Sequence, residues 1–154
     1  MLAQPTAWGL IAGPSISALG EGLRLWAAGH LVKAGGVTRS GPYRHTRNPL
    51  YLGSALLGAG FGLATGRVLF LVGWVLFFGL VYWPVMRTEE AHLAEKYPSV
   101  YPGYAAETPL FWPSIAPHGE RGEFRWSQLV ANREHHTALG VAAVYLLLLA
   151  RFAA

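Results

Sequence analysis

The 154-residue sequence contains no cysteine and few charged residues. Without cysteine the chain can form no disulfide, no thiolate nucleophile and no cysteine-ligated metal site. Charged residues make up 13%, about half the share that is usual in a soluble globular domain, whereas hydrophobic residues make up 53%. The N-terminal letters MLAQPTAWG also lack the basic region of a secretory signal peptide. These shortages favour an integral membrane protein that keeps its apolar segments.

Long uncharged runs predict helices that cross the bilayer. The clearest run, 68–86, would cover roughly 30 Å at about 1.5 Å per residue, which is the thickness of the hydrocarbon core. A second run, 49–65, is joined to it by a short turn, and the pair predicts a tight helical hairpin. Segments 6–32 and 137–154 are less pure and complete about four spans. We therefore expect an all-α, multi-pass membrane protein in which residues 1–154 form one domain.

Polar and small residues within these spans indicate how the helices pack. Glu21 and Arg24 lie three positions apart on one helical face, so they could pair. A partner is needed because a central charge costs roughly 2.5–3.5 kcal/mol on insertion scales. Gly58, Gly62 and Gly66 recur every fourth residue, a spacing that would admit a neighbouring helix at close range.

The basic residues are distributed unevenly about the predicted spans. Nine of the twelve lysines and arginines lie in two polar segments, 33–48 and 87–136. The positive-inside rule then predicts that both segments face the cytoplasm, with both termini outside, in a bacterial cytoplasmic membrane. Topology thus accounts for the net charge of +4, and we expect no nucleic-acid partner.

Two polar clusters flank the predicted hairpin. The letters GPYRHTRNPLYLG (41–53) lead into its first helix, and RTEE (87–90) follows its second. Packed helices lie about 8–10 Å apart, so the two clusters should meet at the cytoplasmic edge of the membrane. Arginines bind carboxylates through paired hydrogen bonds, and glutamates accept hydrogen bonds from hydroxyl or ammonium groups. This chemistry suits S-adenosylmethionine, a nucleotide or a lipid head group, and the residues alone leave all three open.

The two clusters and the hairpin between them resemble a known family. GPYRHTRNPLYLG, the apolar hairpin and RTEEAHLAEKYPSVYPGY together resemble the isoprenylcysteine carboxyl methyltransferases and, more distantly, the phospholipid N-methyltransferases. The resemblance runs from about Leu23 to Pro113. It implies a membrane enzyme with a cytoplasm-facing cofactor pocket that takes up S-adenosylmethionine and releases S-adenosylhomocysteine. The methyl group would pass to a prenylated, lipid or other lipophilic acceptor from the bilayer, with membrane lipids as surroundings and partners.

The resemblance also implies roles for individual residues. Arg87 and Glu90 are the catalytic candidates, and Arg87 would orient a carboxylate of the acceptor or the cofactor. With the adjacent His45 included, the cofactor pocket would be formed by Tyr43, Arg44, His45, Arg47, Asn48, Pro49, Tyr51, Gly53, Glu89, Glu90, Tyr101 and Tyr104. No metal site is expected.

The methylated atom stays open at this point. A carboxylate acceptor is already ionised and needs no base. An amine acceptor must lose a proton, for which Glu89, Glu90 and His45 are candidates. Asn48 stands where many members of the family have histidine, which removes one possible base.

Two other functions compete with methyl transfer. Sterol-type membrane reductases share a related helical core and a similar R-[HN]-P-x-Y segment, but they bind NADPH. A non-catalytic lipid-binding membrane protein would use Arg44, Arg47 and Arg87 only to anchor the ends of its helices.

Overall fold

The computed structural model describes residues 6–32, 36–119 and 121–153. Within these ranges the chain is helical or irregular and contains no strand, as the predicted all-α class requires. Small parts of the predictions lie outside the described residues. They are residues 1–5 of the predicted domain, residues 33–35 at the start of segment 33–48 (Lys33 among them), residue 120, and residue 154 at the end of the final span.

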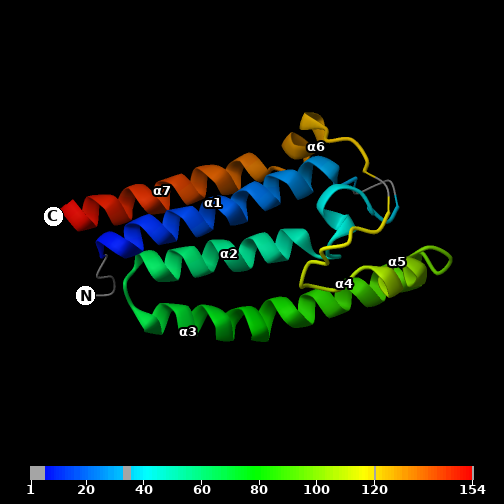
Figure 1. The fold of residues 1–154 in the computed structure, drawn as a ribbon, viewed down its shortest axis with the longest axis horizontal. Helices are drawn as coiled ribbons and strands as arrows, with labels where there is room; N and C mark the ends of the chain where they lie inside the picture. Colours follow the sequence, from blue (N-terminus) through cyan, green and yellow to red (C-terminus); the bar gives the residue numbers. More distant parts are fainter. Residues whose placement is uncertain (1–5, 33–35, 120, 154) are drawn as a thin grey trace.

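Four long helical rods make up the molecule (Figure 1). Three of them, α1 (Ala7–His30), α2 (Pro49–Ala64) and α7 (Glu134–Ala153), cover nearly the residues of three predicted spans. The described part of α1 begins, and that of α7 ends, at the end of the bundle where α2 turns into the fourth rod (Figure 1). The opposite end carries the short elements η1 (Gly41–Arg44), α5 (Tyr101–Glu107) and α6 (Trp126–Ala131).

The fourth rod is one continuous helix, Val68–Lys96, that runs ten residues beyond the end of the predicted span 68–86. It consists of α3 (Val68–Phe77), a π-helical turn η2 (Phe78–Tyr82) and α4 (Trp83–Lys96). The turn is wide because the Trp83 N–H donates to the carbonyl of Phe78, five residues back. Pro84 follows Trp83 and has no N–H to donate, so the regular series of α-helical hydrogen bonds would be interrupted here in any case.

Two rods of the described chain are long and apolar enough to cross a membrane. They are the continuous helix Val68–Lys96 and α7. The shorter α2, with 16 residues, is also apolar. The predicted count of four spans therefore goes beyond what length and composition establish.

Helices α1 and α2 pack closely because glycines lie at their contact. A Cβ atom at Gly20 would lie 2.6 Å from the carbonyl oxygen of Gly53, and one at Gly13 would lie 2.7 Å from that of Gly60. Neither position has room for a side chain, so the two backbones approach each other directly.

The glycine row predicted to admit a neighbouring helix works differently. Gly58 and Gly62 face α3, but they receive the side chains of Trp74 and Leu71 rather than its backbone. Gly66 has a φ of 68° and forms the turn between the rods. The closest approach of backbones thus lies on the α1 side of α2, at glycines outside the predicted row.

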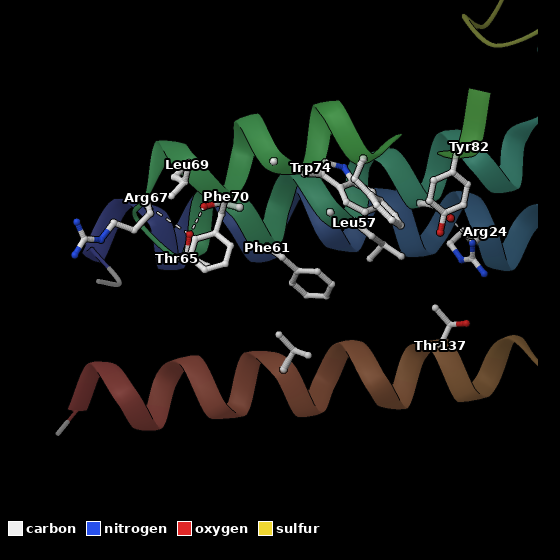
Figure 2. Close-up of a pocket in the computed structure, with 16 residues that line it drawn as sticks. Arg24, Leu57, Phe61, Thr65, Arg67, Leu69, Phe70, Trp74, Tyr82 and Thr137 are labelled. Atoms are coloured by element: carbon white, nitrogen blue, oxygen red, sulfur yellow. Dashed lines mark hydrogen bonds between the residues drawn. The ribbon is translucent and has the colours of Figure 1, made fainter. Parts of the chain in front are cut away.

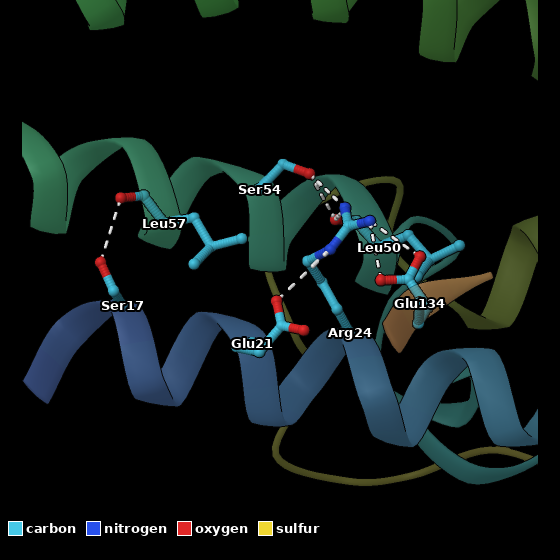
Figure 3. A network of polar contacts seen from close by, with 7 residues as sticks. All are labelled: Ser17, Glu21, Arg24, Leu50, Ser54, Leu57 and Glu134. Carbon is cyan, nitrogen blue, oxygen red and sulfur yellow. Dashed lines mark hydrogen bonds and ion pairs between the residues drawn. The ribbon is translucent and has the colours of Figure 1, made fainter. Parts of the chain in front are cut away.

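A buried polar network joins α7 to α1 and α2 (Figure 3). The Arg24 guanidinium donates to the two carboxylate oxygens of Glu134 at 2.8 and 2.9 Å and to the Ser54 hydroxyl at 2.6 Å. The predicted partner, Glu21, lies 4.0 Å from Arg24 Nε. Both Glu21 carboxylate oxygens are buried and have no hydrogen-bond partner within the described part of the chain. Arg24 therefore bonds mainly to a glutamate 110 residues away, which spacing along one helix could not reveal.

Candidate functional site

A cavity of about 340 Å³ lies at the end of the bundle where α1, α2, α4 and α5 come together, and we call it the polar cavity. Nine of the thirteen predicted site residues line it. Among the described residues, its lining consists of Leu31, Val32, Gly36, Val37, Thr38, Tyr43, Arg47, Asn48, Pro49, Leu50, Tyr51, Glu89, Glu90, Leu93, Tyr101 and Tyr104.

The two predicted clusters meet through charged side chains in this cavity. Arg47 forms an ion pair with Glu90, and its Nη1 also donates to the Tyr101 hydroxyl at 3.3 Å. Tyr51 donates to a carboxylate oxygen of Glu89 at 3.1 Å. The predicted meeting of residues 41–53 with RTEE is therefore confirmed. This contact depends on α4, because Glu89 and Glu90 lie on the part of the continuous helix that extends beyond the first residue of α2.

Residues 109–118, which we call the strap, hold the loop that carries Arg47. The Arg47 N–H, the Asn48 side-chain amide and the Thr46 hydroxyl donate to carbonyls of the strap at 2.9, 3.0 and 2.9 Å. Thr46 is almost fully buried. Because backbone and side-chain bonds act together, the position of Arg47 is fixed before any ligand binds.

Pro102, before the strap, and the strap residues Phe111 and Trp112 differ in their structural roles. Pro102 lies in the first turn of α5, where a missing N–H costs nothing, so it starts a helix. Phe111 is buried and its ring lies 5.5 Å from that of Phe78, whereas Trp112 is 75% exposed. Of these two aromatic residues, only Trp112 is thus open to its surroundings.

Three tyrosines form one wall of the polar cavity. The Tyr104 hydroxyl donates to the carbonyl of Tyr43 at 2.8 Å. Burial raises the pKa of Tyr43 and of Tyr104 well above the usual range for a phenol. Burial also raises the pKa of Tyr101, against an opposing effect of the Arg47 hydrogen bond. All three side chains are therefore neutral near pH 7 and offer rings and hydroxyls to a ligand.

Four predicted residues do not line the cavity. Gly53 packs against α1, and His45 Nδ1 lies 2.8 Å from a carbonyl of the strap. Arg87 is 60% exposed in its side chain and bonds to Glu90 at 2.7 Å from outside the cavity. Arg44 lies next to the cavity lining in sequence, but its Nε is buried without a hydrogen-bond partner among the residues described.

Sequence reasoning missed the part of the lining that comes from residues 31–38. Leu31, Val32, Val37 and Thr38 face the cavity, and Gly36 adopts a φ of 102°. Leu31 and Val32 stand at the end of the predicted span 6–32, and residues 33–38 belong to a predicted polar segment. Val37, an apolar residue within that polar segment, is the signal that could have placed it at a site.

The polar cavity contains unpaired donor capacity beside its carboxylates. Arg47 Nε is buried and has no hydrogen-bond partner in the described chain, although Nη1 bonds to Glu90 and Tyr101. A buried donor of this kind usually has a partner. Together with Glu89 and Glu90, it gives the cavity both a cationic donor and anionic acceptors, a combination that complements a zwitterion.

A second and larger cavity, about 1180 Å³, lies between α2, α3 and α7, and we call it the apolar groove (Figure 2). Its walls are mainly apolar and include Leu57, Phe61 and Phe70. Polar side chains lie at its two ends. Arg24, Ser54, Tyr82 and Thr137 are at the end nearer the polar cavity, and Thr65 and Arg67 are beside the α2–α3 turn (Figure 2).

Known proteins resemble this chain over much of its length. It is 34% identical over 128 residues to the cobalt-zinc-cadmium resistance protein CzcN of Cupriavidus metallidurans, across 82% of this chain and 56% of that protein. It is 32% identical over 95 residues to the nickel-cobalt-cadmium resistance protein NccN of Alcaligenes xylosoxydans xylosoxydans, across 60% of this chain and 44% of that protein. The chain thus spans about half the length of these curated relatives. No solved structure matches it.

A family model gives the broader assignment. The model for phospholipid methyltransferases matches residues 8–100, more than half of the chain. The matched residues include α1, the helical hairpin and both polar clusters. The match and the two long apolar helices point to a membrane protein. The chain belongs to the phospholipid methyltransferase family, whose members, with the isoprenylcysteine carboxyl methyltransferases, are membrane methyltransferases.

Proposed function

We propose that this chain is an S-adenosylmethionine-dependent methyltransferase that methylates a lipophilic acceptor at the cytoplasmic edge of the membrane. The observation that carries the proposal is the polar cavity, in which Arg47 lies against Glu90 and Tyr101 directly beside an apolar groove. Membership of the family supports the reaction class. Neither cavity alone would indicate methyl transfer between a polar donor and an apolar acceptor.

The residues of the polar cavity fit the cofactor. The unpartnered Nε of Arg47 can donate to its carboxylate, and Glu89 and Glu90 can accept from ribose hydroxyls or the ammonium group. The neutral rings of Tyr101 and Tyr104 can hold a sulfonium by cation–π attraction. A volume of about 340 Å³ also lies within the range of about 300–1,000 Å³ that is common for small-molecule sites.

The contribution of the protein to the reaction is alignment. When bound, S-adenosylmethionine supplies the methyl group: a lone pair of the acceptor bonds to the methyl carbon, the C–S bond breaks, and its electron pair stays on sulfur. Holding the reacting atoms in line can contribute roughly 7–11 kcal/mol. Arg47 and Glu90 would fix the cofactor in the cavity. Arg87 would act through Glu90, which it contacts from outside, so it positions a binding residue.

The apolar groove would hold the chain of the acceptor. Its apolar walls suit a prenyl or acyl chain, and its polar end near Arg24 and Tyr82 suits a carboxylate or amine head group. In this proposal α1, α2, the Val68–Lys96 helix and α7 all cross the bilayer of a bacterial cell. The end of the bundle that carries the polar cavity and most basic residues would then face the cytoplasm.

A different role suggested by the relatives has less support. Their names refer to resistance to cobalt, zinc, cadmium and nickel. In the described part of this chain, no group of three or more histidine, aspartate or glutamate side chains could hold a metal ion. For this chain we therefore propose a part in metal resistance only through methylation of a lipophilic acceptor.

Cofactor titration tests the proposal. Isothermal titration of the detergent-purified protein should show saturable binding of S-adenosylmethionine. Arg47→Ala and Glu90→Ala should each weaken it at least about tenfold, because each removes a charge-assisted contact. Arg125→Ala and Glu123→Ala change exposed residues of the same types outside both cavities and serve as matched controls.

The same titration distinguishes the competing functions. No binding by the wild-type protein would refute the methyltransferase assignment. Thermal stabilisation by NADPH but not by S-adenosylmethionine would support a reductase instead. Wild-type affinity in Arg47→Ala and Glu90→Ala would refute the assigned site.

A further inference from the structure

The polar cavity and the apolar groove share a boundary, which we call the seam and which consists of Arg24, Leu50, Tyr51 and Tyr82. Leu50 and Tyr51 line the polar cavity, whereas Arg24 and Tyr82 line the groove. Arg24 donates to the carbonyl of Leu50 at 3.3 Å. The rings of Tyr51 and Tyr82 meet edge to face with centroids 5.7 Å apart. Only one layer of side chains therefore separates the two cavities.

Tyr82 is held at the seam by the π-helical turn η2. Its ring stacks on Phe78 with centroids 5.0 Å apart and meets Phe77 at 5.8 Å and Trp74 at 6.1 Å. The side chain points into the polar end of the groove, toward Arg24 (Figure 2). Four aromatic neighbours, counting Tyr51, thus fix the ring while its far end faces the cavity.

The hydroxyl of Tyr82 is the unused polar group at this place. It makes no hydrogen bond within the part of the chain that the structure describes. Among the neighbouring groups, the Arg24 Nη atoms bond to Glu134 and Ser54, and the Tyr51 hydroxyl bonds to Glu89. A tyrosine hydroxyl at an apolar site usually finds a partner, so a ligand is the natural one here.

We propose that the Tyr82 hydroxyl binds the head group of the methyl acceptor at the seam. This inference rests on the proposed function. The acceptor class is an amphiphile with either a carboxylate head, whose oxygen accepts a hydrogen bond from Tyr82, or an amine head, whose N–H donates one to the Tyr82 oxygen so that its lone pair stays free to attack. Its chain lies along Phe61 and Leu57 in the groove, and its head reaches the seam beside the polar cavity. Tyr82 keeps its proton and holds the nucleophilic atom opposite the methyl donor.

The Tyr82→Phe variant tests this role because it keeps the ring and its four aromatic contacts. The assay measures transfer of a radiolabelled methyl group from S-adenosylmethionine to bacterial membrane lipid extract at increasing lipid concentration. We expect the half-saturating lipid concentration to rise at least about fivefold, the effect of one lost hydrogen bond. Cofactor affinity and the midpoint of thermal unfolding should stay at wild-type values, because Tyr82 does not line the polar cavity.

Tyr97→Phe is the matched control, since Tyr97 lines neither cavity. It should leave the half-saturating lipid concentration unchanged. Alkaline treatment of the labelled product distinguishes the two head groups: a methyl ester releases its label as methanol, whereas an N-methyl group keeps it.

The inference and the proposed function fail in different ways. A wild-type protein that neither binds S-adenosylmethionine nor transfers its methyl group refutes the function. An active wild type combined with a Tyr82→Phe variant of unchanged half-saturating lipid concentration refutes the inference alone. A loss of cofactor affinity in Tyr82→Phe would also overturn it, because the tyrosine would then act on the other cavity.

Discussion

The two glutamates beside Arg24 should respond in opposite ways to loss of their charge. Glu134 forms two short hydrogen bonds with the guanidinium, whereas Glu21 lies at 4.0 Å and makes none. The side chains of Arg24 and Glu134 are only 16% and 8% exposed. One arginine thus balances two buried carboxylates, and only one of them has favourable geometry. We predict that Glu134→Gln is strongly destabilising and that Glu21→Gln is not.

Two independent considerations give the magnitude for Glu134→Gln. Removing one partner of a buried ion pair costs about 3–5 kcal/mol. A central arginine without a partner costs roughly 2.5–3.5 kcal/mol on membrane insertion scales. Glu21 remains near Arg24 and compensates in part, so we expect the lower figure, about 3 kcal/mol. This lowers the equilibrium constant for folding by roughly a hundredfold.

For Glu21→Gln we expect a change in the free energy of unfolding within about 0.5 kcal/mol of zero, or a small stabilisation. The substitution removes a desolvated charge that gains no hydrogen bond. Reversible unfolding in mixed detergent micelles, followed by circular dichroism, measures both variants against the wild type. The joint replacement Arg24→Leu with Glu134→Leu should cost less than the sum of its two single replacements, because neither residue of this pair is left without the other, although Glu21 then stays buried without a cation.

Equal losses in Glu21→Gln and Glu134→Gln would refute this reasoning. They would mean that Arg24 bonds to both carboxylates alike in the membrane. A double replacement as harmful as the sum of its single changes would refute the assignment of Glu134 as the main partner.

Three further predictions concern packing, the strap and pH. Gly20→Ala should destabilise the protein by about 1–3 kcal/mol because its Cβ meets the α2 backbone, whereas Gly22→Ala, with open space around it, should be neutral or stabilising in the same unfolding assay. Thr46→Val leaves the Phe111 carbonyl of the strap without its side-chain donor and should cost about 1–3 kcal/mol, with weaker cofactor binding by titration. The raised pKa values of Tyr43 and Tyr104 stabilise the fold fully at pH values below the usual tyrosine pKa near 10, and this stability is lost as pH rises through the folded-state values. The midpoint temperature of unfolding should therefore decrease once the pH exceeds 10, and the decrease should be smaller in Tyr104→Phe.

The sequence was most informative where the pattern is local. Uncharged runs placed α2 and α7 to within a few residues, and two short motifs predicted that Arg47 meets Glu90. The helix that contains the third predicted span continues ten residues past the predicted end of that span. Charge marked the expected edge of the membrane at Met86, but helix propensity continued through α4 to Lys96.

Other contacts between distant segments, which no motif marks, were beyond prediction from sequence patterns. Nothing in the sequence pairs Glu134 with Arg24, since the pair depends on how α7 packs. The same holds for residues 31–38 in the polar cavity and for the strap over Thr46. Gly53, assigned by motif to the cofactor pocket, lies instead where α1 and α2 touch, because a motif glycine can be needed for packing as well as for binding.

In the proposed topology, the continuous helix Val68–Lys96 extends from the bilayer to the polar cavity. At about 1.5 Å per residue its 29 residues measure about 44 Å, which exceeds the hydrocarbon thickness by about 14 Å. In this topology Glu89 and Glu90 lie on the part of the helix that projects beyond the bilayer, and Tyr82 lies nearer the membrane on the same helix. A thinner bilayer tilts such a helix and displaces its projecting end. We therefore expect cofactor affinity in nanodiscs to vary with lipid chain length, and equal affinity in short-chain and long-chain lipids would show that the two parts move independently.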